Sequence, residues 1–242
     1  MANPLEIINL SKTYNTKEAV KNISFKLKRN EIVGILGPNG CGKTTTIGMV
    51  LGLLKPTKGK VLINGKEIEN HRVNLLNELN FISPYIELPK KLTVKQNLEV
   101  YGRLYDVKKL KTRIEYLCEK LRLDEFINKI TGELSSGQKN RVSLAKSIIN
   151  DPTVLLLDEP TASLDPETGD FVRSFLEEYQ REKETSILLA SHNMAEVERL
   201  CSSVLMMNKG SIIDKGTPND LISKHGRKNM EEVFLKLTRE KI

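Results

Sequence analysis

The segment Gly37-Pro38-Asn39-Gly40-Cys41-Gly42-Lys43-Thr44 has the spacing of a phosphate-binding loop, in which glycines precede a lysine and a hydroxyl residue. Glycines let the backbone amides of such a loop turn inward on bound phosphates. We expect Lys43 to reach the β- and γ-phosphates and the Thr44 hydroxyl to ligate Mg²⁺. The segment therefore predicts a nucleoside triphosphate site.

The residues on either side of this loop favour the same interpretation. Residues 31–36 form a short apolar run that is typical of a buried strand, and residues 45–51 resume apolar character as a helix does. Strand, glycine loop and helix is the order that a phosphate loop requires. The alternative, a glycine turn that carries a surface lysine, is disfavoured by this order.

Composition indicates a globular chain of ordinary size. With 242 residues, 39% hydrophobic and 29% charged, the chain can bury a core and hold one domain or two unequal lobes. No apolar run approaches the roughly 18 residues that span a bilayer, and residues 1–6 lack a basic and then apolar signal. We therefore expect a soluble chain in the cytoplasm.

The cysteines and the charge balance exclude several classes of site. Cys41, Cys118 and Cys201 are few, odd in number and far apart, which argues against a disulfide framework and shows no metal-ligand spacing. A net charge of +7 is compatible with nucleic acid, an anionic membrane surface or a lysine-rich exterior. Because the lysines are spread along the whole chain, we expect no nucleic-acid partner.

A second motif supplies carboxylates at a strand end. Residues 154–157 are consecutive apolar residues that suit a central parallel strand, and Asp158 and Glu159 follow them. Ligands of open α/β sheets bind at the carboxyl ends of the strands. We expect Asp158 to hold Mg²⁺ through water and Glu159 to polarise the water that attacks the γ-phosphate. The alternative is an acidic strand terminus without a catalytic role.

The pentapeptide at residues 134–138, Leu-Ser-Ser-Gly-Gln, precedes a segment with apolar residues at helical spacing. Ser135 is then the N-cap of this helix, and the backbone amides at the helix start can receive an anion such as a γ-phosphate. A plain helix cap is the alternative.

Two further side chains are candidates for the same site. His192 follows residues 185–190, which read as a buried strand, and precedes a helix that carries Ala195, Val197 and Leu200. It is therefore predicted to lie at a strand end beside the carboxylates. Tyr14 precedes an alternating strand and is the candidate for stacking on a nucleotide base, with a plain surface tyrosine as the alternative.

These motifs stand in the order found in the nucleotide-binding subunits of ABC transporters, which the chain resembles over nearly its whole length. The pentapeptide at 134–138 resembles the family signature LSGGQ, and the overall pattern is most similar to the exporter-type subunits of the ABC-2 group. The resemblance implies ATP and Mg²⁺ as ligands. It also implies a head-to-tail homodimer, or a heterodimer with a similar subunit, that holds ATP between the phosphate loop of one copy and the signature of the other.

The resemblance also implies roles for single positions. His192 would contact the γ-phosphate and hold the attacking water, Asp165 would link the two subunits, and Tyr14 would stack on the base. Glu159, His192 and Lys43 are the expected catalytic residues, and Thr44 and Asp158 the expected metal ligands. The expected nucleotide-binding residues are Tyr14, Gly37, Pro38, Asn39, Gly40, Cys41, Gly42, Lys43, Thr44, Thr45, Ser135, Ser136, Gly137, Gln138, Asp165 and His192.

The chain departs from the family at one position. The family usually has a glutamine at the edge of the strand that leads into its helical lobe, and Tyr85 stands there instead. Tyrosine cannot offer an amide oxygen to Mg²⁺. Gln96 is a poor substitute, since it completes a Thr-x-x-Gln capping box that begins at Thr93. Whether Tyr85 takes over the function of that glutamine is left open.

The predicted fold class is α/β. We expect a phosphate-loop (RecA-like) core with a mainly parallel sheet, an N-terminal antiparallel β portion and an inserted helical lobe. The whole chain, 1–242, is expected to be one ATPase domain. Its core would comprise 1–86 and 136–215, its helical lobe 87–135, and a short helical tail 216–242.

The expected function is that of an ATPase that docks on a separately encoded integral membrane permease and powers translocation of a substrate, with export favoured over import. Such a chain would be cytoplasmic and peripheral on the inner face of the cell membrane. The alternative is a soluble ABC ATPase that acts on DNA or ribosomes. Two smaller expectations concern single residues: inward-facing amides should favour a thiolate at Cys41, and His71 and His225 should be surface residues.

Overall fold

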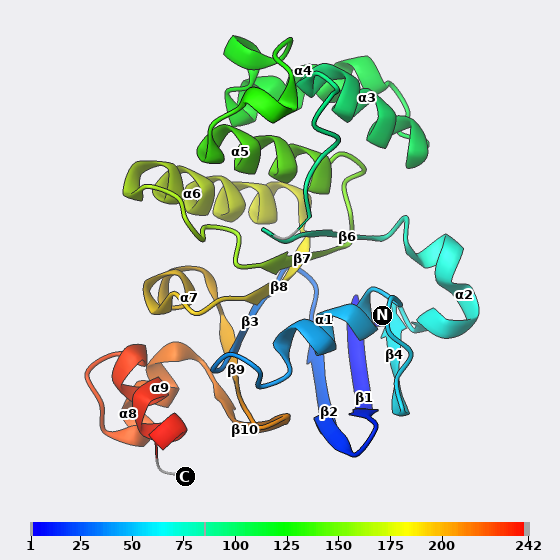
Figure 1. Ribbon diagram of the computed structural model, residues 1–242. Helices are drawn as coiled ribbons and strands as arrows, with labels where there is room; N and C mark the ends of the chain where they lie inside the picture. Colours follow the sequence, from blue (N-terminus) through cyan, green and yellow to red (C-terminus); the bar gives the residue numbers. More distant parts are fainter. Residues whose placement is uncertain (1, 85, 240–242) are drawn as a thin grey trace.

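The strands of the protein form two sheets, shown in Figure 1. The computed structural model describes residues 2–84 and 86–239, so that Tyr85 lies outside the described residues. The first sheet has the order β2-β1-β4-β5 and is antiparallel. Its strands are β1 (Leu5–Tyr14), β2 (Lys17–Leu27), β4 (Lys58–Ile63) and β5 (Lys66–Glu67).

The second sheet has the order β10-β9-β3-β8-β7-β6. All its neighbouring strands run parallel except β10, which is antiparallel to β9. Its strands are β3 (Ile32–Leu36), β6 (Leu79–Ile82), β7 (Val154–Asp158), β8 (Ser186–Ala190), β9 (Ser203–Asn208) and β10 (Ser211–Gly216). A mainly parallel sheet together with an antiparallel N-terminal sheet confirms the predicted fold class.

The central strands of the parallel sheet are buried on both faces. Every residue of β3, β7 and β8 is buried, which is why their sequences read as continuous apolar runs and not as alternating patterns. The strand order places β3, β8 and β7 side by side. The segments that follow these three strands therefore meet at one edge of the sheet, where the predicted site residues lie.

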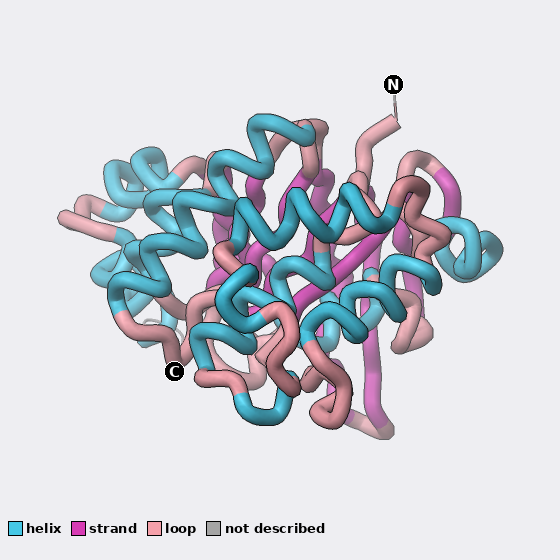
Figure 2. Tube along the Cα trace, turned by 90° about the horizontal axis from the view of Figure 1, so that it is seen from above, coloured by secondary structure: helices cyan, strands magenta, loops and turns pink. Residues whose placement is uncertain are grey.

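Helices lie on both faces of the parallel sheet in Figure 1, and the view from above in Figure 2 shows helices that lie over the strands. Helix α1 (Lys43–Val50) lies between the two sheets, and its residues Ile47, Met49 and Val50 share a buried cluster with Val33 and Ile35 of β3. The remaining core helices are α2 (Ile68–Leu75), α6 (Pro166–Lys183) and α7 (Met194–Leu200). Burying both faces of the parallel sheet in this way removes much apolar surface from water, which is the dominant favourable contribution to folding.

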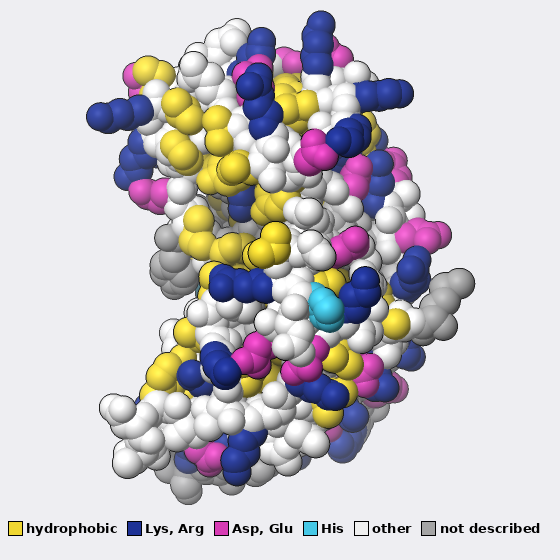
Figure 3. Space-filling model, turned by 90° about the vertical axis from the view of Figure 1, so that its right-hand side faces the viewer, with side chains coloured by type: hydrophobic (Ala, Val, Ile, Leu, Met, Phe, Trp, Pro, Cys, Tyr) yellow, Lys and Arg dark blue, Asp and Glu magenta, His cyan; other side chains and the backbone are white. Residues whose placement is uncertain are grey.

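The segment between β6 and β7 is helical, which agrees with the helical character predicted for 87–135 and continues beyond it to residue 147. It contains α3 (Val94–Leu104), α4 (Leu110–Leu121), two short 3₁₀ turns (Asp124–Phe126 and Thr131–Glu133) and α5 (Ser136–Ser147). Thr93 and Gln96 form the predicted capping box at the start of α3. Figure 3 shows that apolar side chains gather on one face of this part of the molecule.

The C-terminal part holds α8 (Pro218–His225) and α9 (Met230–Arg239), which lie in the stretch predicted as a short helical tail. The expectation that His225 is a surface residue was wrong: its ring is 12% exposed, and Nε2 lies 2.7 Å from a carboxylate oxygen of Asp214. The pairing holds α8 against β10. His71 is exposed, as expected. Among the described residues, no helix is long and apolar enough to cross a membrane.

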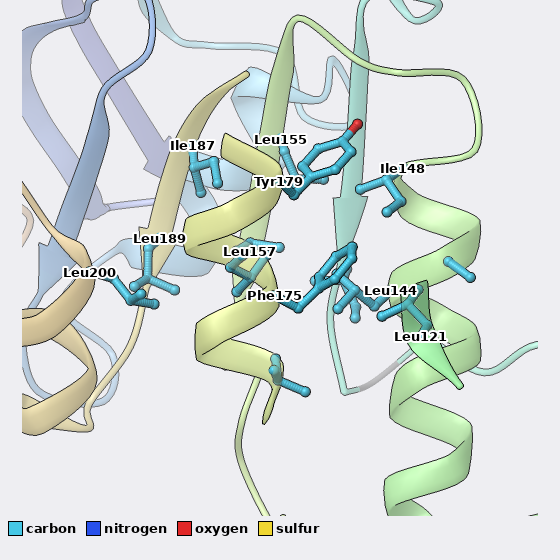
Figure 4. Close-up of a cluster of buried hydrophobic side chains, with 14 of the residues drawn as sticks. Leu121, Leu144, Ile148, Leu155, Leu157, Phe175, Tyr179, Ile187, Leu189 and Leu200 are labelled. Atoms are coloured by element: carbon cyan, nitrogen blue, oxygen red, sulfur yellow. The ribbon is translucent and has the colours of Figure 1, made fainter. Parts of the chain in front are cut away.

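The core on the outer face of the parallel sheet is built on α6, as Figure 4 shows. Leu155 and Leu157 of β7 face Phe175 and Tyr179 of α6, whose rings stack with centroids 5.9 Å apart. Stacked aromatic pairs of this kind pack with a defined geometry. Since β7 carries Asp158 at its end, this packing fixes the position of the carboxylate motif.

Candidate functional site

The phosphate loop is shaped by glycines that no other residue could replace. A β-carbon at Gly37 would lie 2.4 Å from the carbonyl oxygen of Met207. One at Gly42 would lie 2.6 Å from the carbonyl oxygen of Ala19, and the φ angle of Gly42 is 111°. Both positions therefore require glycine, for close approach and for backbone conformation. The loop thus packs against β2 and β9 and leads directly into α1.

The start of α1 is open to an anion. Its N-cap, Gly42, offers no side-chain acceptor, and no acidic residue stands in the first turn. Unpaired amides and the positive end of the helix dipole favour a negatively charged group at such a place. A pocket of about 160 Å³ lies there, lined by Ala19, Asn39, Gly40, Gly42, Lys43, Thr44, Thr45, Asp158 and Glu159. The backbone amides at the start of α1 and the ammonium of Lys43 are donors that suit phosphate oxygens.

Lys43 supplies the positive charge of this pocket. Its side chain is buried, and Nζ donates hydrogen bonds to the carbonyl oxygens of Gly37 at 2.6 Å and of Pro38 at 3.3 Å. The loop carbonyls thus hold the ammonium over the loop. A buried ammonium group needs an anion or hydrogen-bond acceptors nearby, and a bound phosphate would supply both.

Asp158 ends β7 beside this charge. It is 6% exposed, and its carboxyl pKa is raised by burial and by the neighbouring Glu159, against a lowering by Lys43. A buried carboxylate with a second carboxylate beside it is stabilised by a cation. Asp158 and Thr44 line the same pocket, and they offer the hard oxygen ligands that Mg²⁺ prefers. The pair therefore fits the metal that the sequence predicted.

No larger metal cage exists in the part of the chain that the structure describes. No group of three or more His, Cys, Asp or Glu side chains is placed there to hold a metal ion. Mg²⁺ commonly keeps several waters and binds proteins through one or two side chains together with substrate phosphates. The Thr44 and Asp158 pair matches this mode of binding.

Glu159 and His192 meet at the strand ends. Glu159 lies just past β7 with a φ of 52°, and its backbone amide donates to the carbonyl oxygen of Ala190 at the end of β8. Nδ1 of His192 lies 2.7 Å from a carboxylate oxygen of Glu159. Residues 33 positions apart in sequence are brought into contact because β7 and β8 are neighbouring parallel strands.

The signature segment is a capped helix start on the surface. The Ser135 hydroxyl accepts from the amide of Gln138 at 3.3 Å, and the Gln138 side chain accepts from the amide of Ser135 at 3.1 Å. This capping box confirms Ser135 as the N-cap and occupies Gln138 within its own chain. Ser135 and Ser136 are exposed. Among the described residues, 135–138 do not line the 160 Å³ phosphate pocket.

Asp165 is also an N-cap. Its carboxylate accepts from the backbone amide of Thr168 at 2.9 Å at the start of α6, and its pKa is lowered by the hydrogen bonds from Thr168. The residue is exposed to solvent. The structure thus gives Asp165 a local structural role and leaves it accessible to a second molecule.

Tyr14 lies at the end of β1, where it is 44% exposed. The ammonium of Lys12 lies 5.1 Å from the centre of its ring and donates to the carbonyl oxygen of Lys55 at 2.8 Å. One face of the ring is thus occupied by a cation. Tyr14 does not line the phosphate pocket as the described residues form it.

The expectation of a thiolate at Cys41 was wrong. Cys41 is 2% exposed, and burial raises the pKa of its thiol, although Lys43 acts in the opposite direction. Its sulfur lies close to Gly37, since a β-carbon built at Gly37 would lie 2.5 Å from it. Desolvation outweighs the nearby positive charge, so the thiol stays protonated at neutral pH.

A second, larger pocket adjoins the site. Its volume is about 290 Å³, and it lies between the inserted helices and the strand ends. Asp158 and Glu159 line this pocket as well as the phosphate pocket. The other lining residues are mixed: Ile82, Ile86, Leu88 and Leu164 are apolar, and Ser136 of the signature segment is among the polar ones.

Sequence reasoning missed a buried acid next to His192. Glu196 is fully buried and accepts hydrogen bonds from the hydroxyls of Ser191 and Thr161. Its position in the sequence, in the first turn of a short helix, suggests only a favourable charge near the helix start. No sequence signal could have shown that two distant hydroxyls converge on it.

Comparison with known proteins gives a consistent result. The profile of the family described as "ABC transporter" matches residues 20–162. The ABC transporter ATP-binding protein NatA of Bacillus subtilis is 34% identical over 221 residues, which cover 90% of this chain and 89% of that protein. The Nod factor export ATP-binding protein I of Rhizobium johnstonii is 37% identical, over 90% of this chain and 70% of that protein.

Solved structures agree with the sequence comparison. The structure of an ATP binding subunit of an ABC transporter has a TM-score of 0.89 at 26% identity and covers 96% of this chain and 98% of that one. The cbiO1 protein of Clostridium perfringens, described as part of the ABC transporter complex cbiONQ, has a TM-score of 0.82 at 30% identity, with 93% and 92% covered.

Proposed function

Since this chain belongs to the ABC transporter family and is an ATP-binding ATPase, we propose that it powers substrate export through a separately encoded membrane permease. The observation that carries the proposal is that Lys43, Asp158 and Glu159 line one pocket beside the ends of parallel strands, and that His192 contacts Glu159 there. Hydrolysis of ATP requires phosphate binding, metal binding and activation of a water molecule. Lys43, Asp158 and Glu159 are chemically suited to these three steps, in that order.

Phosphate binding falls to the loop and Lys43. The uncapped amides of α1 and the ammonium of Lys43 receive the β- and γ-phosphates of ATP. Lys43 has three donor hydrogens, so that it can keep its bond to Gly37 while it donates to phosphate oxygens. Thr44 and Asp158 would hold Mg²⁺, which neutralises charge on the phosphates when it is bound.

Water activation falls to Glu159 and His192. The carboxylate of Glu159 accepts a proton from the attacking water, whose oxygen forms a bond to the γ-phosphorus as the bond to ADP breaks. His192, whose side chain is exposed, contacts the carboxylate of Glu159 at 2.7 Å. It would hold this carboxylate in place and contact the γ-phosphate. Tyr14 stacks on the base, with its ring oriented by Lys12.

A second copy completes the site. The exposed start of α5, with Ser135, Ser136 and Gly137, offers backbone amides to a γ-phosphate that lies outside its own chain. Asp165 is exposed on the loop that precedes α6 and can contact the opposite copy. The proposed assembly is a head-to-tail dimer of this chain, or of this chain with a similar subunit.

The permease docks on the inserted helices. Val100 and Leu104 of α3 are 44% and 71% exposed, and Ile86 before α3 is 50% exposed. Figure 3 shows apolar side chains gathered on one face of the part of the molecule that holds the inserted helices. Exposed apolar surface of this kind fits a cytoplasmic segment of a membrane protein that presents apolar side chains. The chain would then lie on the inner face of the cell membrane.

Export is the favoured direction. Support comes from the likeness to a protein named for Nod factor export and from the similarity of the sequence to ABC-2 exporter-type subunits. The permease partner is supported by the likeness to cbiO1, which is described as part of a multi-subunit transporter complex.

Purification of the tagged chain from detergent-solubilised membranes of its own source tests the proposal. We expect an integral membrane protein in the purified fraction and ATPase activity that rises in its presence. Leu104→Glu should lose this protein, whereas Leu235→Glu, at an exposed site on α9, should keep it. Recovery without a membrane protein, or stimulation by DNA or ribosomes, would contradict the transport role.

A further inference from the structure

Glu196 lies between the two loops that carry the reactive groups. It stands in the first turn of α7 and is fully buried. One carboxylate oxygen accepts from the Ser191 hydroxyl at 2.6 Å, and the other accepts from the Thr161 hydroxyl at 2.8 Å. An ionised carboxylate only accepts hydrogen bonds, so it holds both hydroxyls as donors at the same time.

Burial of an ionised carboxylate at this place lowers the stability of the fold. Burial raises the pKa of Glu196, the two hydroxyl bonds lower it, the charge of Glu159 raises it further, and Arg173 lowers it. An apolar side chain could fill the same volume without this cost. The acid therefore provides something that packing does not, namely a fixed distance between two hydroxyl groups.

The two hydroxyls belong to the segments that flank the reaction centre. Ser191 directly precedes His192, and its oxygen also accepts from the amide of Asn193 at 3.1 Å. Thr161 lies two residues after Glu159, in a loop folded back on itself, because the amide of Ala162 donates to the carbonyl oxygen of Glu159 at 3.1 Å. This loop continues through Ser163 to the exposed Asp165.

We propose that Glu196 is a positioning residue that connects the His192 segment to the loop 160–165. The contact between His192 and the carboxylate of Glu159 then depends on the position of that loop. The inference rests on the proposed function, since it assigns both His192 and Glu159 to hydrolysis. Its consequence is that a contact made by a second copy at Asp165 is transmitted to His192 through Thr161, Glu196 and Ser191.

Thr161 offers the sharpest test, because the hydroxyl can be removed without a change of shape. Thr161→Val removes the donor and keeps the branched side chain, and Thr161→Ser keeps the donor and removes a methyl group. We expect Thr161→Val to lower kcat by about tenfold with the KM for ATP changed less than about twofold, and Thr161→Ser to retain most of the parent kcat. Equal losses in both variants, or a parent kcat in Thr161→Val, would overturn the inference.

A double-mutant cycle separates positioning from folding. In the His192→Ala background, Thr161→Val should cause no further loss of kcat, because the group that it positions is gone. A loss of the same size in both backgrounds would show that Thr161 acts independently of His192. Glu196→Gln should resemble Thr161→Val, since an amide presents only one acceptor oxygen to two hydroxyls.

The same experiments distinguish this inference from the proposed function. Glu159→Gln is assayed alongside, with binding of a fluorescent ATP analogue as the control for an intact phosphate loop. If Glu159→Gln hydrolyses ATP at the parent rate, the proposed function fails. If Glu159→Gln is inactive and Thr161→Val is fully active, only the bridge through Glu196 is overturned.

Discussion

Nδ1 of His192 lies 2.7 Å from a carboxylate oxygen of Glu159, although the histidine side chain is 67% exposed and the glutamate 16%. An exposed ring rarely keeps one orientation without a partner, and the carboxylate supplies it. The same contact engages Nδ1, so that Nε2 is the ring nitrogen left for another partner.

His192→Ala should therefore affect hydrolysis more than binding. We expect kcat to fall by about 100-fold or more, because correct placement of an acid or base typically contributes a factor of this order. The affinity for a non-hydrolysable ATP analogue should change little, since the phosphate loop is untouched. Steady-state phosphate release and equilibrium binding measure the two effects. A parallel loss of affinity would assign His192 to binding instead.

Cys41 should be slow to react despite its place in the phosphate loop. The thiol is buried and its pKa is raised by desolvation. We expect iodoacetamide at pH 7.5 (about one unit below the usual thiol pKa) to modify Cys41 at least about 100-fold more slowly in the folded chain than in urea. Peptide mass spectrometry over time gives the rate. Rapid modification of the folded chain that ATP prevents would restore the thiolate interpretation.

The buried ammonium group of Lys146 on α5 should lower the free energy of unfolding at neutral pH. Burial lowers the pKa of its ammonium from 10.5 to about 8, while the rings of Phe81 and Tyr101, 5.4 and 5.3 Å away, compensate in part. The pKa shift corresponds to about 3 kcal/mol, against about 1–2 kcal/mol from the two rings. Desolvation is the larger effect, so Lys146→Met should raise the free energy of unfolding at pH 7 by about 1–2 kcal/mol.

The pH dependence of this gain follows from the sign of the shift. A lysine whose folded pKa lies below its unfolded pKa destabilises the fold fully below the folded value, and the cost disappears as pH rises from about 8 to about 10.5. Urea unfolding at pH 7 and pH 10 should thus show the gain shrink. Lys111→Met, at a side chain that is 92% exposed, is the control. A gain independent of pH would point to packing alone.

The Asp214 cluster should contribute stability that is lost in acid. Burial raises the carboxyl pKa, but hydrogen bonds from Lys224 and His225 outweigh it, so the folded pKa is lowered. A depressed carboxyl pKa stabilises the fold above the unfolded value, near 3.9, and this stability is lost as pH falls through the folded pKa.

Asp214→Asn should lower the free energy of unfolding at pH 7 by about 1–2 kcal/mol, the cost of weakening two charge-assisted hydrogen bonds. The difference from the parent chain should shrink below about pH 4. Chemical unfolding at pH 7 and at pH 3.5 (about the unfolded carboxyl pKa) measures this difference. A deficit of the same size at both pH values would contradict the ionic origin.

The sequence predicted well the features that depend on neighbouring residues. The apolar runs before Asp158 and before Ser191 are strands β7 and β8, because a strand buried on both faces needs apolar residues at every position. The capping box at Thr93 and the N-cap at Ser135 follow from residue types near the helix start. The glycines of the phosphate loop could be recognised from their spacing to Lys43 and Thr44.

What the sequence could not predict depends on contacts between distant segments. Cys41 is buried beside Gly37, which keeps its thiol protonated, and the ring of His225 is only 12% exposed because it pairs with Asp214 of β10. The bridge from Thr161 to Ser191 through Glu196 joins residues that are 30 positions apart. Such contacts are set by how the elements pack, and periodicity carries no information about them.

Phosphate release by purified Glu159→Gln, compared with the parent chain under saturating ATP and Mg²⁺, tests the central claim most directly. Glutamine keeps the shape of the side chain but cannot accept the proton from water, so we expect hydrolysis to fall by at least about 100-fold while ATP binding persists. The bound nucleotide should then hold two copies together, which sedimentation would detect. Hydrolysis at the parent rate by Glu159→Gln would contradict the account.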